Sequence, residues 1–182
     1  MDLYTLLKLL HVVAAIVWVG GGLSIMVAAT LAHLRHDDEG MLRVFSTVPE
    51  LGRLWFMPAS MLTLLSGIAV TTVGGLWSQL WIVLALGGIA ATILTGILVF
   101  EPMGKQIGAF LAEGRTADAV AVARRIMRIA RFDYALMFVI VADMVLKPGY
   151  GDWIALGALG AIVAIAAIAF LLPRRSQRPA VA

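Results

Sequence analysis

Several ionisable side chains lie within the long apolar stretches of this chain. They are Lys8, His11, Glu101, Asp133 and Asp143. An ionisable group surrounded by hydrocarbon is costly, so each is a candidate for a function or for a specific pairing. The chain has no cysteine, which excludes thiolate metal sites, iron–sulfur clusters and disulfides. Motifs for hydrolysis or nucleotide binding, such as GxSxG, HExxH and Walker loops, are also missing.

The first apolar stretch, LLKLLHVVAAIVWVGGGL, places four notable residues on one helix face. At about 100° per residue, Lys8, His11, Trp18 and Gly22 fall within a narrow stripe, so we expect them to face the same neighbour. A neutral imidazole ligates haem iron or another metal through one nitrogen, glycine lets a flat group approach, and tryptophan stacks on it. Alternatively, His11 bonds to a backbone carbonyl of the next helix and the glycines serve close packing.

Asp143 stands near the end of another apolar stretch, in VADMVLKPG. Lys147 follows it at four residues, the order that favours an ion pair on a helix. Alternatively, Asp143 accepts a proton from a substrate or holds the second nitrogen of His11, and it is then a candidate catalytic residue together with Lys8. Met137 and Met61 are candidate second axial ligands of a haem, because a thioether is a known haem ligand.

The composition identifies the environment in which these residues work. Hydrophobic residues make up 62% of the 182 and charged residues 14%, and the mean hydropathy is +0.97. These values are typical of an integral membrane protein. The length suits one helical bundle, 1–173, with a basic tail, 174–182, because a span needs about 20 apolar residues. The net charge of +3 comes from arginines clustered in connections, so we expect no nucleic-acid partner.

The apolar stretches predict an all-α fold of five transmembrane helices, at 3–33, 54–73, 79–101, 132–147 and 153–172. Arginine and lysine gather in the connections 34–53 and 102–131 and in the tail. The positive-inside rule therefore places the N-terminus outside and the C-terminus in the cytoplasm. We expect Asp133 and Glu101 to pair with the cytoplasmic arginines. No internal repeat stands out.

An amphipathic helix is expected on the cytoplasmic side at about 115–131, running into the span predicted at 132–147. Arg124, Arg128 and Arg131 recur on one face, opposite an apolar face that includes Ile126. Such a helix is expected to lie on anionic lipid headgroups, although a regulatory or partner-binding role is the alternative.

The motifs of the first helices resemble a bacterial superfamily of small membrane proteins. They are K-x-x-H followed by W-x-G-G, and M-P-x-x-M-L-T-L-x-x-G-I, within residues 6–100. The superfamily includes the copper resistance protein D family, the HemJ-type protoporphyrinogen oxidases, and predicted integral membrane proteins of unknown function, which this chain resembles most. The resemblance implies a bundle in the bacterial inner membrane. It implies that His11 is associated with b-type haem, although no lysine in 79–101 matches that of the HemJ-type enzymes.

Three functional hypotheses follow. The first is an outer-half pocket around His11 that binds haem b or a related redox cofactor and exchanges electrons with a membrane substrate, as in a haem-dependent membrane oxidoreductase. The second is binding or transport of copper or a small solute by His11, Asp143 and methionines. The third is a non-catalytic subunit or assembly factor, whose glycine-rich faces pack against a membrane partner or a second copy of the chain.

Overall fold

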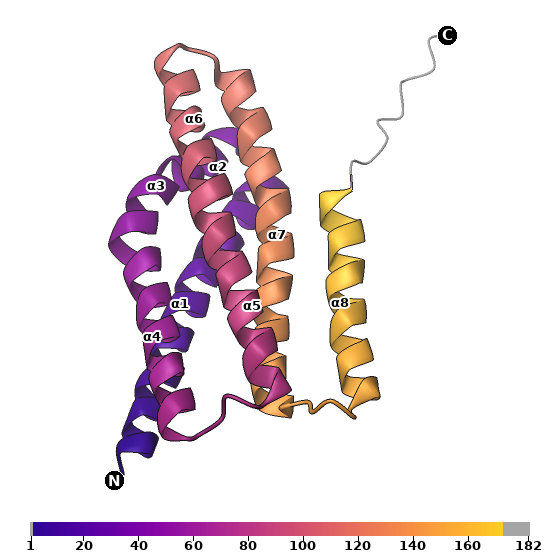
Figure 1. The fold of residues 1–182 in the computed structure, drawn as a ribbon. Helices are drawn as coiled ribbons and strands as arrows, with labels where there is room; N and C mark the ends of the chain where they lie inside the picture. Colours follow the sequence, from indigo (N-terminus) through magenta and orange to yellow (C-terminus); the bar gives the residue numbers. More distant parts are fainter. Residues whose placement is uncertain (1, 173–182) are drawn as a thin grey trace.

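The computed structural model describes residues 2–172, which form helices and short connections and contain no strand. Five long helices stand side by side in Figure 1: α1 (Leu3–Leu34), α4 (Met57–Val73), α5 (Leu80–Thr95), α7 (Thr116–Leu146) and α8 (Trp153–Leu171). The predicted all-helical bundle of five long helices is confirmed. The predicted basic tail, 174–182, lies outside the described residues.

Shorter elements collect at one end of the bundle. They are α2 (Asp38–Ser46), α3 (Val48–Leu51), the π-helical turns η1 (Gly52–Phe56) and η2 (Gly96–Phe100), and α6 (Glu101–Ala112), which continues the axis of α5. We call this end, which carries the basic connections 35–53 and 101–131, the charged end. The N-terminus and the connections 74–79 and 147–152 lie at the other end, the short-loop end (Figure 1).

Four helical segments are long and apolar enough to cross a membrane: Leu3–Leu34, Asp38–Val73, Leu80–Ala112 and Trp153–Leu171. Helix α7 is not among them, because Arg131, Asp133 and Asp143 interrupt its apolar run. It nevertheless packs against α1, α5 and α8 and runs alongside them in Figure 1. The helix predicted at 132–147 is the second half of this longer helix.

The first half of α7 is the amphipathic segment predicted at 115–131, and it runs without a break into the segment predicted at 132–147. Its apolar face is buried inside the protein, in a cluster with α2 and α6 that includes Met41, Ile107, Ala119, Ala123 and Ile126. Side chains of α2 and α6 cover this apolar face. The prediction of headgroup contact concerned the opposite face, which carries the arginines. Lipid contact of the arginine face stays a prediction.

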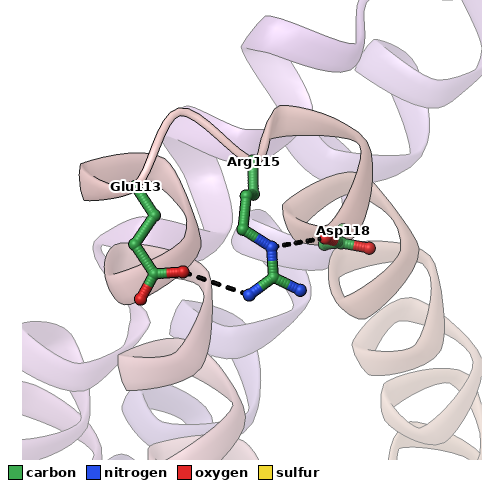
Figure 2. Close-up of polar contacts among 3 residues, drawn as sticks. All are labelled: Glu113, Arg115 and Asp118. Atoms are coloured by element: carbon green, nitrogen blue, oxygen red, sulfur yellow. Dashed lines mark hydrogen bonds and ion pairs between the residues drawn. The ribbon is translucent and has the colours of Figure 1, made fainter.

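The turn between α6 and α7 is held by one arginine. Gly114 takes the left-handed backbone conformation, with a φ of 73°, which glycine adopts without strain. The Arg115 side chain donates to Glu113 Oε2 at 3.1 Å and to Asp118 Oδ2 at 2.8 Å (Figure 2). These bonds to the two carboxylates raise the pKa of Arg115 above its ordinary value. The turn therefore keeps α7 antiparallel to α6.

Candidate functional site: a cavity near the charged end

A cavity of about 390 Å³ opens among α1, α4, α5, α7 and the two π-helical turns. Its apolar wall includes Trp18 and Met137, which are buried, and Phe56 and Tyr134, which are half-buried. Met57, also in the wall, is exposed. The cavity therefore reaches from the interior of the bundle to its surface.

The wall toward the charged end is polar. It contains Arg53, Glu101, Lys105 and Asp133. The Lys105 ammonium donates to Glu101 Oε1 at 2.6 Å, whereas Arg53 makes no ion pair with any residue in 2–172. The cavity thus combines an apolar body with a polar end that carries an unpaired cation.

Two predicted pairings in this wall are wrong. Glu101 pairs with Lys105, one helical turn away, and not with an arginine. Asp133 is 4% exposed and forms no ion pair within the described part of the chain. It faces the cavity from α7, so it lies away from the exposed arginines of the same helix.

Both π-helical turns contribute to the cavity, and a proline explains each of them. The Met57 N–H bonds to the Gly52 carbonyl, and the Glu101 N–H bonds to the Gly96 carbonyl, each five residues back. A proline follows at 58 and at 102. A proline ring clashes with the carbonyl four residues earlier, and a wider turn relieves that clash. Such turns occur frequently at functional sites.

The two turns share a short sequence repeat that was not among the predictions. GRLWFMP, at 52–58, and GILVFEP, at 96–102, share the pattern G-x-L-x-F-x-P. The glycine and the phenylalanine of both copies line the cavity. This repeat is the signal by which the sequence could have located the site.

Gly22 allows α1 and α7 to approach each other at the cavity. A Cβ atom at this position would overlap the Tyr134 hydroxyl group and lie 2.9 Å from Tyr134 Cζ and 3.4 Å from Phe56 Cε1. Gly20, two residues earlier, has no atom within 4 Å of the same point. The glycine at 22 is therefore required by close packing. Tyr134, which lines the cavity, was not predicted as a site residue.

His11 lies outside this cavity and against α4. Its Nδ1 atom is 2.9 Å from the Thr63 carbonyl oxygen and 3.4 Å from the Ser66 hydroxyl oxygen. Gly67 leaves room for the ring, since a Cβ there would lie 2.9 Å from His11 Cε1. The bond to a carbonyl of the next helix is the alternative that the sequence left open. With the proton on Nδ1, Nε2 keeps a free lone pair.

The residues predicted to form one stripe on α1 do not share one neighbour in the structure. Trp18 and Gly22 line the cavity, together with Met137. Lys8 is exposed, so it does not face the same neighbour as the others. Met61, half-buried on α4, is not in the cavity wall.

Asp143 does not form its predicted ion pair. The left-handed backbone of Lys147, with a φ of 50°, ends α7, and the Lys147 ammonium lies 5.5 Å from the centre of the Trp81 ring. Neither Asp143 oxygen has a hydrogen-bond partner among the described residues, so Asp143 does not hold His11 either. Asp143 lines a second cavity, which also includes Gly87, Gly88 and Gly160.

Comparison with protein families gives one match. Residues 5–148 match the family described as predicted integral membrane protein (DUF2269). This chain belongs to the DUF2269 family. Curated proteins and solved structures give no match. The match to DUF2269 extends from α1 to the end of α7 and includes every residue of the cavity near the charged end.

The DUF2269 chain has few side chains that could bind a metal ion without an additional cofactor. Among the described residues, no three side chains of His, Asp or Glu lie close enough together to bind one. Of the predicted haem ligands, Met137 lines the cavity, whereas His11 and Met61 do not. A haem within this cavity would therefore lack His11 as an axial ligand. What the cavity offers is an apolar body, a cation and hydrogen-bonding groups.

Proposed function

We propose that this membrane protein binds a flat, lipophilic molecule with an acidic end in the cavity near the charged end. The observation that carries the proposal is Arg53, which forms no ion pair within residues 2–172, at one end of an aromatic and apolar cavity. Acidic quinone-like compounds and porphyrins share this chemistry.

The dimensions and the lining both support this ligand class. Small-molecule sites are typically about 300–1,000 Å³, mostly apolar, with a few placed polar groups, and the cavity of about 390 Å³ falls within this range. Trp18 and Phe56 offer flat faces on which a ring can stack. Arginine is the side chain best suited to a carboxylate, because it donates two parallel hydrogen bonds.

Arg53→Gln is expected to weaken the binding of protoporphyrin IX, a porphyrin dicarboxylic acid, by about tenfold, the loss expected for one charge-assisted interaction. Binding is measured in detergent by the quenching of tryptophan fluorescence, and Trp18→Phe identifies the part of the signal that arises in the cavity.

Arg43→Gln is the matched control, because Arg43 is exposed, pairs with Glu39 and lies outside the cavity wall. The dimethyl ester of the porphyrin tests the role of the acidic end on the ligand side. Equal affinities for the two arginine variants, or for acid and ester, would contradict the proposal.

A haem b attached to His11 at the surface between α1 and α4 is the second candidate. The Nδ1 hydrogen bond to the Thr63 carbonyl favours it, because a ligating histidine usually donates its other ring N–H to such a group. Haem supplies four nitrogens of its own and needs only an axial ligand from the protein. When bound, it would provide one-electron redox chemistry. His11 would hold the iron, and Thr63 and Gly67 would fix the ring.

Purified protein from haem-replete cells is expected to show a Soret band that His11→Ala removes completely. His33→Ala is the control, because His33 lies near the other end of α1. A colourless protein, or a full Soret band in His11→Ala, would eliminate this candidate. Gly67→Ala should shift the band, since its methyl group would press on the imidazole.

The remaining expectations stand as inferences from sequence. We infer from the positive-inside rule that the arginines of the charged end face the cytoplasm. A bacterial inner membrane is what the resemblance to the superfamily implies. A relationship to the copper resistance and HemJ-type families is inferred from the short motifs around His11. Copper transport is less well supported than ligand binding, because the described residues bring no three His, Asp or Glu side chains together.

A further inference from the structure

Asp143 is a buried carboxyl group with no partner. Its side chain is 3% exposed, and neither of its oxygens accepts a hydrogen bond from any residue of the described chain. Buried polar groups in proteins are almost always hydrogen-bonded. An orphaned carboxyl group inside an apolar helical bundle therefore indicates either a bound proton or a partner that is not part of these helices.

The carboxyl group faces a cavity of about 370 Å³ between α5, α7 and α8. The wall is otherwise apolar, formed by side chains such as Leu84, Ile140 and Leu159. Gly87 and Gly160 widen it, because a Cβ atom at either position would have no other atom within 4 Å. The cavity thus has the space for a ligand and one polar anchor.

No charge of the described helices compensates Asp143. Helices α5 and α8 contain no ionisable side chain, and Lys147 lies over the Trp81 ring. On α1, which also packs against α7, the ionisable side chains of the same half are Tyr4, Lys8 and His11, and none of them lines this cavity. Toward the charged end of α7, Asp133 and Tyr134 belong to the other cavity.

An ionised carboxylate without a counter-ion is strongly disfavoured in such surroundings. The site is therefore stable in two forms, with a proton on Asp143 or with a cation beside the carboxylate. We propose that the cavity at Asp143 binds a lipophilic organic cation in exchange for one proton. The O–H bond of the carboxylic acid breaks, the proton passes to water, and the carboxylate pairs with the cation. No electron is transferred.

The lining selects an organic cation over a metal ion. Calcium takes about 6–8 oxygen ligands, and magnesium about 6, but this cavity offers only one carboxyl group among apolar side chains. An organic cation covered with hydrocarbon buries its own apolar surface against Leu84 and Leu159 and needs only the one counter-charge.

Tetraphenylphosphonium is the probe, because it is cationic, lipophilic and unable to donate a hydrogen bond. Equilibrium dialysis of the purified protein should show saturable binding that Asp143→Asn weakens at least tenfold. Asp143→Glu should retain it, because the charge is kept. A weakly buffered sample with a pH indicator should release close to one proton per cation bound.

Asp133→Asn is the matched control, since it removes a buried carboxyl group of the same helix from the other cavity. It should leave both readouts unchanged. Gly160→Leu tests the space directly, because it fills the cavity without touching the carboxyl group. Equal binding by the parent protein and Asp143→Asn, or binding without proton release, would overturn the proposal. Full binding by Gly160→Leu would also do so.

Discussion

Gly22→Leu is expected to abolish porphyrin binding in the cavity near the charged end and to lower the free energy of unfolding by about 1–3 kcal/mol, the usual cost of overpacking. The reason is geometric. The first atom of the new side chain would already overlap the Tyr134 hydroxyl group. To relieve the overlap, Tyr134 must rotate into the cavity, or α1 must move away from α7.

The unfolding free energy is measured by titration with sodium dodecyl sulfate in mixed micelles. Gly20→Leu is the control, because Gly20 is exposed and has open space around it. It should be neutral or slightly stabilising, since glycine in a helix interior costs about 0.5–1 kcal/mol relative to alanine. If both leucine variants behave alike, the close contact between Gly22 and Tyr134 is not part of the native structure.

Met41→Ala is expected to destabilise the protein by about 2–5 kcal/mol, the range for truncating a large buried side chain. Met41 is completely buried and joins α2 to the faces of α6 and α7 that contain Ile107 and Ala123. Truncating this side chain leaves a void in the buried cluster that α2, α6 and α7 form at the charged end.

The same denaturant titration measures this effect, with Leu34→Ala as the control. Leu34 ends α1 close to α2 in sequence but is 68% exposed, so its loss should change the unfolding free energy by less than about 0.5 kcal/mol. Comparable losses in the two variants would show that the short helices at this end do not form a packed core.

The long helices could be predicted from the sequence because each corresponds to a continuous apolar stretch. Helix α1 was expected at 3–33 and extends from Leu3 to Leu34. In α7, the amphipathic pattern up to Arg131 and the apolar pattern after it form one helix, as the sequence predicts. The charges at the junction mark a change of surroundings along that helix and not a break in it.

The site could be predicted only in part, because spacing along one helix does not define what the helix faces. His11 and Trp18 share a stripe, but His11 meets α4 at Thr63, whereas Trp18 lines a cavity shared with α5 and α7. The Asp143 and Lys147 pair failed for a local reason. The helix ends in a left-handed residue at Lys147, and its ammonium lies over an aromatic ring on α5.

The π-helical turns change the direction in which the side chains after them point around the helix axis. In an ideal α-helix every fourth residue drifts by about 40° around the axis, so a row at this spacing leaves its face within three steps. The wider turn at η2 offsets this drift. Ile93, Ile97, Glu101 and Lys105, each four residues apart, therefore all border the same cavity. One unbroken row of side chains follows the ligand space from its apolar body to its charged end, whereas an uninterrupted α-helix of the same length would turn Glu101 and Lys105 away from it.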